Sequence, residues 1–341
     1  MRNFFIQWLR ACNMPKVLHI GPCETPGGMA NVMRILAEYP PEGWQAETLS
    51  SHTNGSSFAK WFAYRRARGA FARMLSDEEQ RPDIVHLHTA ADWSWWRKRR
   101  FAKMACRAGV PNIVHIHSGK FDTWLNTSHA RTLKFRNDVL SSQSNIVVLS
   151  HSWQDKFREL FGDTNVIHNP LDPALKIESN TIRDSNKILF LARNDPIKGG
   201  DFAQKLVDEL RQQEPSLFLA MSGIRTSEHS WIQPLGWMTE EEKRMQMSTA
   251  SILIVPSEFE GQPMVALEAL AMGTPVLLSD RIHSLPDTIP QAQFGNMEDW
   301  KNNILHLLTS KSHPFDENLL RDYSMTSVQE QWKKYYENLL K

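Results

Sequence analysis

Residues 256–275 read PSEFEGQPMVALEALAMGTP, and this stretch decides the fold that we expect. It follows a short apolar run at residues 251–255, SILIV, which is typical of a buried strand. Apolar residues then recur at helical spacing from Met264 onward. The stretch therefore predicts a strand, a loop that carries Glu260 and a helix that carries Glu268. Because ligands bind at the carboxyl ends of strands in open α/β sheets, both carboxylates are candidate binding groups.

The start of this helix is a candidate anion site. Backbone N–H groups at a helix N-terminus favour an anion, and carboxylates accept hydrogen bonds from sugar hydroxyls. The loop therefore suits one ligand that contains a sugar, a diphosphate and a ribose. The candidate residues beside the two glutamates are Gly261, Gln262, Met264 and Val265. Taken alone, two glutamates eight residues apart are more often solvated charges on a helix.

A second strand and loop supply positive charge. Residues 187–191, KILFL, predict a buried strand, and the segment ARNDPIKGG follows directly. It places Arg193 and Lys198 in one loop before a further helix. Arginine offers a planar fork and lysine a mobile point charge, so the two can neutralise a departing diphosphate without a metal.

A glycine pair near the start of the chain is the third element. The strand at residues 16–20, KVLHI, leads into a loop in which Gly27 and Gly28 precede a helix. Paired glycines let a backbone approach a phosphate closely. The GxGxxG spacing of the dinucleotide fingerprint is missing, and a glycine pair before a helix is often only a tight turn.

Five segments in this order resemble the retaining glycosyltransferases of family 4, which have the GT-B fold. They are GGMANVMRILA from Gly27, HIHSGKF from His115, SHSWQDKF…VIHNPLD from Ser150, RNDPIKGG from Arg193 and the Glu-x7-Glu stretch itself. The resemblance covers nearly the whole chain. It implies two Rossmann-like, doubly wound α/β domains that face a cleft.

Strand and helix signals alternate along the chain, which predicts parallel sheets. We expect an acceptor-side domain at residues 14–170, a linker at 171–186, a nucleotide-sugar-binding domain at 187–325 and a final helix at 326–341 that crosses back to the first domain. The strands are expected at residues 16–20, 46–50, 83–88, 112–117, 145–149, 187–191, 217–222, 251–255 and 275–278.

The resemblance also implies a reaction: transfer of a hexose from a nucleotide-sugar with retention at the anomeric carbon. Arg193 and Lys198 would stabilise the leaving diphosphate, Glu260 would hold the sugar hydroxyls and Glu268 the ribose hydroxyls. His117 would lie beside the transferred sugar, with His115, one strand step earlier, as the alternative. We expect a UDP- or GDP-sugar donor, a saccharide or lipid-linked saccharide acceptor, and a role in cell-surface polysaccharide synthesis (exopolysaccharide or lipopolysaccharide) or glycolipid synthesis. No cofactor and no metal are expected.

Pro263 departs from the family pattern, because many relatives carry a glycine there. Proline has no N–H to offer a phosphate, but it is well tolerated in a first helical turn. The amides of Met264 and Val265 are therefore the two candidates for contact with the diphosphate.

Histidines alternate along two expected strands, as His86 and His88 in VHLH and as His115 and His117 in VHIH. Side chains two residues apart point to the same face of a strand. Four imidazoles could bind zinc, but no carboxylate or cysteine stands at a ligand-like spacing. Buried histidines often bond a backbone carbonyl instead, and a site without metal is the expectation.

Residues 91–107, ADWSWWRKRRFAKMACR, mix tryptophan with basic residues. Such a mix suits an anionic membrane surface or an acceptor carried on a lipid diphosphate. An ordinary helix with a solvated basic face fits equally well, and stacking on nucleic acid is a third alternative. The residues expected on the acceptor or membrane side are Trp93, Trp95, Trp96, Arg97, Lys98, Arg99 and Arg100.

Composition sets further limits. The chain has 341 residues, which suits two domains, and a net charge of +1, which gives no support to bulk nucleic-acid binding. Three cysteines without CxxC spacing favour a reducing compartment, so we expect a cytoplasmic protein that can sit on the inner face of the cell membrane. Residues 1–13 lack a signal-peptide pattern and are expected to be a short amphipathic helix or not part of the native start.

Three other functions fit parts of the sequence. A nucleotide-sugar epimerase of GT-B fold is an enzyme of another class, and it would form an isomer without any acceptor. A phosphorylase of similar architecture would need a lysine-bound pyridoxal phosphate. A partner protein without catalysis would not need the charged set of Arg193, Lys198, Glu260 and Glu268.

Overall fold

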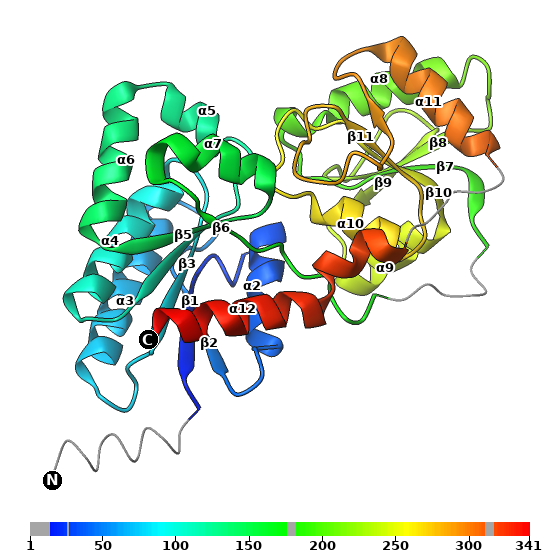
Figure 1. The fold of residues 1–341 in the computed structure, drawn as a ribbon. Coiled ribbons are helices and arrows are strands. Elements are labelled where there is room, and N and C mark those ends of the chain that lie inside the picture. The colour runs from blue at the N-terminus through cyan, green and yellow to red at the C-terminus, as the bar shows by residue number, and fades with distance from the viewer. Residues whose placement is uncertain (1–13, 26, 176–181, 311–316) are drawn as a thin grey trace, which may run out of the picture. The chain divides into compact units, whose positions relative to one another are not determined.

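The computed structural model describes residues 14–25, 27–175, 182–310 and 317–341, and these residues form two compact α/β units (Figure 1). Unit 1 contains the chain up to Pro170 together with Tyr323–Lys341, and unit 2 is Leu171–Asp322. The expectation for residues 1–13 lies outside the described residues.

Unit 1 is built on a six-stranded parallel sheet with the order β2-β1-β3-β4-β5-β6. This is the flavodoxin-like doubly wound order: β1 lies between β2, at one edge, and β3, and the chain then proceeds to the other edge. The strands are β1 (Lys16–Gly21), β2 (Gln45–Ser50), β3 (Ile84–Thr89), β4 (Asn112–Ile116), β5 (Ser144–Val148) and β6 (Asn165–Val166).

Helices cover both faces of this sheet (Figure 1). One face packs against α3 (Ser57–Ser76), α4 (Trp93–Arg107), α6 (His129–Ser141) and α7 (His151–Phe161), with Phe71, Phe101 and Phe135 fully buried between them. The short α5 (Phe121–Asn126) contributes Phe121 to the same core. The apolar alternation of the strands fills this core with Val, Ile and Leu.

The opposite face of the sheet is covered by α2 (Gly28–Glu38) and α12 (Met325–Leu339). Trp332 and Tyr336 of α12 are buried there. The Gln329 side chain donates hydrogen bonds to the carbonyls of Tyr39 and Pro40, just after α2, both at 3.2 Å. The expectation that the final helix returns to the first domain is therefore confirmed.

Unit 2 has a six-stranded parallel sheet with the order β12-β11-β10-β7-β8-β9, the order of the dinucleotide-binding fold. The strands are β7 (Asp184–Phe190), β8 (Phe218–Ser222), β9 (Ile232–Gly236), β10 (Ala250–Val255), β11 (Val276–Ser279) and β12 (Gln291–Ala292). Helices α8 (Gly200–Leu210) and α11 (Met297–Thr309) cover one face, and α9 (Glu240–Thr249) and α10 (Met264–Ala271) the other.

Most expected strands are present within one to three residues, and the α/β class is confirmed. Strands β6, β9 and β12 were not expected. Two of them are only two residues long, too short to show a period, and β9 contains Pro234, which argues against a strand. Strand β7 begins at Asp184, so it includes three residues of the expected linker.

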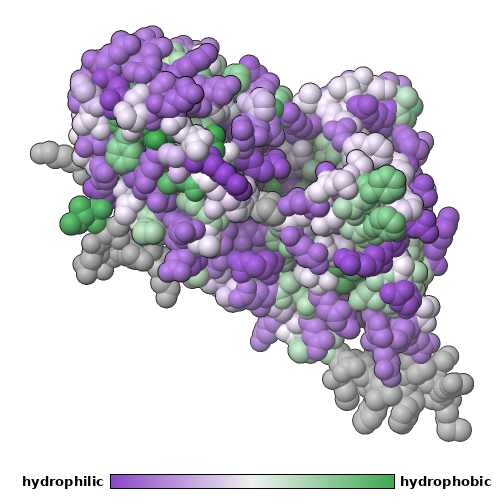
Figure 2. Space-filling model, turned by 180° about the vertical axis from the view of Figure 1, so that it is seen from behind, coloured by the Kyte–Doolittle hydropathy of each residue, from purple (hydrophilic) through white to green (hydrophobic). Residues whose placement is uncertain are grey.

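The surface is largely polar. Figure 2 shows one face of the molecule on which hydrophilic side chains predominate and hydrophobic ones form small separate patches. Among the described helices, none combines the length and the apolar character needed to cross a bilayer.

Candidate functional site

The Glu-x7-Glu stretch and the Arg-Lys loop meet at the carboxyl ends of two neighbouring strands of unit 2. Strands β7 and β10 pair in parallel, although two other strands lie between them in the sequence. The chain leaves β7 toward one edge of the sheet and returns beside it as β10. This is the switch point at which open α/β sheets bind ligands.

Lys198 and Glu260 form the centre of this candidate site. The Lys198 ammonium lies 2.7 Å from Glu260 Oε1, and the Ser257 hydroxyl donates to the same oxygen at 2.9 Å. Both charged side chains are mostly buried, with 17% and 13% of their surface exposed. The pair therefore presents a lysine and a carboxylate whose positions are fixed.

The two loops are also joined through their backbones. The amide of Glu258 donates to the carbonyl of Ile197 at 2.9 Å. Gly199 has a φ of +77°, and a Cβ at this position would lie 2.6 Å from the carbonyl oxygen of Pro256. Only glycine fits both the conformation and the space, so the loops pack too closely for a side chain between them.

Arg193 lies in the same loop as Lys198 but is much more exposed. Its side chain is 62% exposed, and Nη2 is 3.8 Å from Asp195 Oδ2. Asp195 in turn caps the 3-10 turn Pro196–Lys198 by accepting from the amide of Ile197 at 3.3 Å. The guanidinium is thus held loosely by its neighbour and is accessible to a ligand.

Helix α10 begins at the expected place, with Pro263 as its N-cap and no side chain capping it. The carbonyl of Pro263 accepts from the amides of Ala266 and Leu267. Within the described chain, the amides of Met264 and Val265 have no acceptor. These are the two amides expected to contact the diphosphate, because Pro263 has no N–H. Gly261 and Gln262, just before it, are buried.

Glu268 lies one turn into α10 and is almost completely buried, with 3% exposure. Lys243 of α9 approaches Glu268 Oε2 to 2.9 Å and also pairs with Glu240 at 2.6 Å. Burial raises the pKa of Glu268, and the Lys243 ammonium opposes this rise. Burial lowers the pKa of Lys243, but the two carboxylates outweigh it and the net shift is upward.

Lys243 is a site residue that the sequence did not point to. It stands in the run EEEKR, where a lysine among glutamates is typical of a solvated helix face. Nothing in that run predicts contact with Glu268, twenty-five residues later.

In unit 1, the glycine pair stands where it was expected. Gly27 is the N-cap of α2 with a φ of +143°, a conformation that other residues rarely adopt, and Gly28 is the first helical residue. A Cβ at either position would meet nothing within 4 Å, so the space around the pair is open. The glycine at Gly27 is explained by its backbone conformation.

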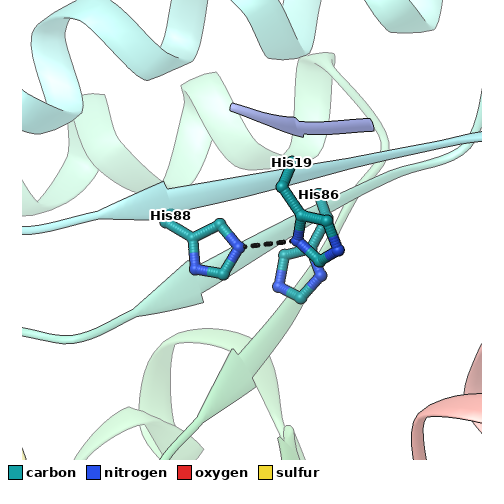
Figure 3. A group of neighbouring side chains, drawn as sticks. All are labelled: His19, His86 and His88. Atoms are coloured by element: carbon teal, nitrogen blue, oxygen red, sulfur yellow. Dashed lines mark hydrogen bonds between the residues drawn. The ribbon is translucent and has the colours of Figure 1, made fainter. Parts of the chain in front are cut away.

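His117 belongs to a network of five histidines on the α12 side of the unit 1 sheet. The fifth member is His19 of β1, which the sequence did not indicate; it adds to the two pairs that the sequence shows at β3 and β4. Figure 3 shows His19 and His88 joined by a hydrogen bond, with His86 beside them. His19 Nδ1 is 2.9 Å from His88 Nε2, and His88 Nδ1 is 2.9 Å from His117 Nε2.

A second branch of the network leads to the last helix. His86 Nδ1 lies 2.9 Å from the Tyr336 hydroxyl, and His86 Nε2 lies 3.0 Å from His115 Nδ1. Nε2 of His115 is buried without a partner among the described residues. Burial lowers the pKa of all five histidines, to about 3 for His19, so the network is neutral at physiological pH.

Two triads of this network, His19–His86–His88 and His88–His115–His117, have ring nitrogens within 4.8 Å of one another. Two nitrogen ligands of a tetrahedral zinc ion lie about 3.3 Å apart, whereas hydrogen-bonded nitrogens lie closer. The 2.9 Å separations are those of hydrogen bonds. Since a neutral imidazole has one N–H and one lone pair, His88 donates to one neighbour and accepts from the other.

The tryptophan-rich segment forms α4, and only part of it faces solvent. Trp95 is 4% exposed and packs against Phe135, with ring centroids 4.8 Å apart. Lys98 is 1% exposed, and its ammonium donates to the Ser51 hydroxyl at 2.6 Å. The expectation that Trp95 and Lys98 belong to the acceptor or membrane surface is therefore wrong. Helical periodicity turns both toward the core.

Each unit matches a glycosyltransferase family model. Residues 26–175 match the model of Glycosyltransferase Family 4, and residues 173–319 match that of Glycosyl transferases group 1. Together the two matches account for most of both units. The chain belongs to the family-4-like glycosyltransferases and has the GT-B fold.

Individual relatives agree with this class. Glycogen synthase of Mycobacterium tuberculosis is 26% identical over 277 residues, covering 73% of this chain and 66% of the relative. The putative glycosyltransferase EpsF of Bacillus subtilis is 28% identical, covering 58% and 57%. This chain thus matches about two thirds or less of the length of these relatives.

A solved structure supports the fold. The crystal structure of Anabaena HepE in complex with UDP and glucose superposes with a TM-score of 0.70 at 15% identity. It covers 95% of this chain and 100% of the HepE chain.

Proposed function

We propose that the protein transfers a hexose from a nucleotide-sugar, a UDP- or GDP-sugar, to a saccharide or lipid-linked saccharide, with retention at the anomeric carbon. The observation that carries this proposal is the fixed Lys198–Glu260 pair beside the unbonded amides of Met264 and Val265. A diphosphate needs cations and N–H donors, and a sugar needs a carboxylate acceptor. The switch point of unit 2 offers both.

In the proposed reaction, negative charge builds on the leaving diphosphate as its bond to the anomeric carbon breaks. Lys198, Arg193 and the amides of α10 stabilise that charge, and Glu260 orients the sugar through its hydroxyls. The acceptor oxygen forms the new bond on the face that the diphosphate leaves, and its proton passes to a diphosphate oxygen. Cationic side chains take the place of a metal.

Glu268 is proposed to accept hydrogen bonds from the ribose hydroxyls. Its carboxylate is buried and pairs with the Lys243 ammonium, which favours the charged form that accepts hydrogen bonds. His117 is proposed to bond a sugar hydroxyl. A neutral imidazole suits this role because it can donate or accept.

The relatives favour an acceptor in cell-surface polysaccharide synthesis. A putative teichuronic acid biosynthesis glycosyltransferase of Bacillus subtilis, TuaC, is 23% identical over 240 residues, and a Klebsiella pneumoniae protein from a cps region is 26% identical over 257. Epimerisation is not favoured by any of these relatives.

Thermal-shift measurements against UDP-, GDP- and ADP-sugars identify the donor. A ligand at about a hundred times its dissociation constant stabilises the folded state by about 2.7 kcal/mol. The anomeric configuration of the product, read by NMR, then tests retention. An inverted product would contradict the mechanism, and isomer formation without any acceptor would indicate an epimerase.

A further inference from the structure

Helices α3 and α4 of unit 1 concentrate positive charge. Residues 57–76 and 93–107 contain eleven Lys and Arg and no Asp or Glu. The whole chain has 39 basic and 38 acidic residues, so everything outside these helices has 28 basic and 38 acidic residues, a net charge of −10. The overall charge of +1 is therefore the sum of a strongly basic region, α3 and α4, and an acidic remainder of the chain.

Large aromatic side chains are exposed at the start of α3. Phe58, Trp61 and Phe62 are 76%, 47% and 61% exposed. Their spacing of three and four residues places them on one side of the helix. Arg65 and Arg66 continue the same stripe by one turn and are exposed as well.

Helix α4 repeats this pattern beside α3. Trp93 and Trp96 are 69% and 36% exposed, and Arg100 follows one turn later, with its guanidinium 5.6 Å from the Trp96 ring centroid. The Tyr64 ring of α3 lies 5.8 Å from that of Trp96, so the two stripes adjoin. We call the exposed residues of both stripes the α3–α4 face.

The positive charge of these helices is mostly not neutralised by the protein. Across the described residues, only Arg99 and Lys103 of the eleven form ion pairs, both with Asp138. Nε of Arg68 and Nε of Arg97 are buried without a partner there. Apart from the buried Lys98, the remaining cations can therefore pair with an external anion.

The α3–α4 face combines two features that one kind of partner satisfies. Aromatic rings favour the boundary between water and hydrocarbon, and arginines pair with lipid phosphates. We propose that this face docks unit 1 on an anionic lipid bilayer. The aromatic residues of the two first turns enter the interface and the arginines contact head groups. The docking does not depend on sugar transfer, and it is measured without any substrate.

Nucleic acid also combines phosphates with a preference for aromatic rings, but the ring arrangement disfavours it. Trp61 and Phe62 meet edge to face at 5.1 Å, and so do Trp93 and Trp96 at 5.5 Å. In each pair, the edge of one ring covers a face of the other. Stacked bases need a free π-face, so these pairs are poor platforms for them. Insertion into a bilayer needs only apolar volume.

Co-sedimentation with vesicles tests the proposal. The full chain is mixed at physiological salt with vesicles of phosphatidylcholine alone or of phosphatidylcholine with phosphatidylglycerol. We expect binding to the anionic vesicles only. Arg65→Gln with Arg66→Gln should lower the partition coefficient about thirtyfold, because each cation near an anionic surface strengthens binding about fivefold. Phe58→Ser, Trp61→Ser and Phe62→Ser combined should lower it more than about tenfold.

Matched variants separate the face from general effects. Lys205 and Lys334 are exposed and outside the face, so Lys205→Gln with Lys334→Gln removes the same charge and should leave binding unchanged. Leu140, 58% exposed on α6, gives the apolar control Leu140→Ser. Equal binding to neutral and anionic vesicles, equal loss in the control variants, or binding of single-stranded RNA without vesicle binding would each overturn the proposal. Since all the substituted residues are exposed, the variants should keep the wild-type circular dichroism spectrum.

Discussion

The two sheets differ in the charge of their polar groups. At the switch point of unit 2, cations and carboxylates lie within 3 Å of each other, as Lys198 with Glu260 and Lys243 with Glu268. On the unit 1 sheet, the polar groups are uncharged imidazoles that bond one another. Burial explains the second state, because a charged imidazole inside a protein has no water to solvate it.

The difference teaches which unit can meet a charged ligand. In a fixed pair of opposite charges, the lysine can bind a phosphate, or the carboxylate a hydroxyl, in place of its partner. Neither group has to change its protonation. A neutral network can exchange hydrogen bonds but cannot offset charge. We therefore propose that unit 2 binds the departing diphosphate and that His117 bonds only a neutral sugar hydroxyl.

The largest expected effect that tests this contrast is on Lys198. Lys198→Ala should lower kcat/KM by about 100- to 1,000-fold, because it removes a preorganised charge from the leaving group. Lys205→Ala removes an exposed lysine from the neighbouring helix and should have no effect. Initial rates with the identified donor give the measurement. A loss below about tenfold would remove Lys198 from the charge-stabilising role.

The next effect concerns nucleotide binding. Glu268→Ala should weaken binding of the free nucleoside diphosphate by about 1–3 kcal/mol, since it deletes buried acceptors for the ribose hydroxyls. Calorimetry with the free nucleoside diphosphate measures this change in affinity. Glu240→Gln is the matched variant, because Glu240 also pairs with Lys243 but its side chain is half exposed. If both variants bind the nucleotide as the wild type does, Glu268 does not contact the ribose.

A smaller effect should appear in the pH dependence of stability. The pKa of His19 is about 3 in the folded protein and about 6.5 in an unfolded chain, so the unfolded state binds more protons between these values. The stability contributed by neutral His19 is complete above pH 6.5 and falls as the pH is lowered toward 3. His19→Gln should make the free energy of unfolding of unit 1 less steep in this window, by up to about 1.4 kcal/mol per pH unit.

The exposed His129 supplies the comparison for this experiment. Denaturant titrations between pH 5 and pH 7 should give His129→Gln the slope of the wild type. The same slope for His19→Gln would show that His19 is not held neutral by burial.

The smallest expected effect is that of a chelator. If Lys198 and Arg193 offset the charge of the diphosphate, excess EDTA should leave the transfer rate within about twofold of its value without chelator. A rate that EDTA abolishes and a divalent ion restores would assign the charge to a metal instead.

Much of this organisation could be predicted from the sequence, because it rests on local signals. The run at residues 251–255, the helix from Met264 and the loop with Lys198 each have a clear period or a clear stop. Their meeting at one edge follows from the rule for parallel sheets. Strands β6 and β12 were missed because two residues are too few to show a period, and β9 because Pro234 argues against a strand.

The partners of the predicted residues could not be read from the sequence. Lys243 reaches Glu268 only because α9 and α10 cover the same face of the sheet, and His19 joins the other histidines only because β1 lies beside β3. The inward turn of Trp95 and Lys98 depends on the phase of α4 against its sheet. Such contacts depend on tertiary packing.

The hydrogen bond between His86 and Tyr336 has a consequence for biosynthesis. The ribosome makes the sheet of unit 1 first, but α12, which covers its histidine face, comes more than 150 residues after the last strand of that sheet. At about 5–20 residues per second, roughly 8–30 seconds pass before α12 is synthesised and can cover this face. During that interval the buried imidazoles are exposed to water, and a nascent chain stalled before Met325 would present them to chaperones.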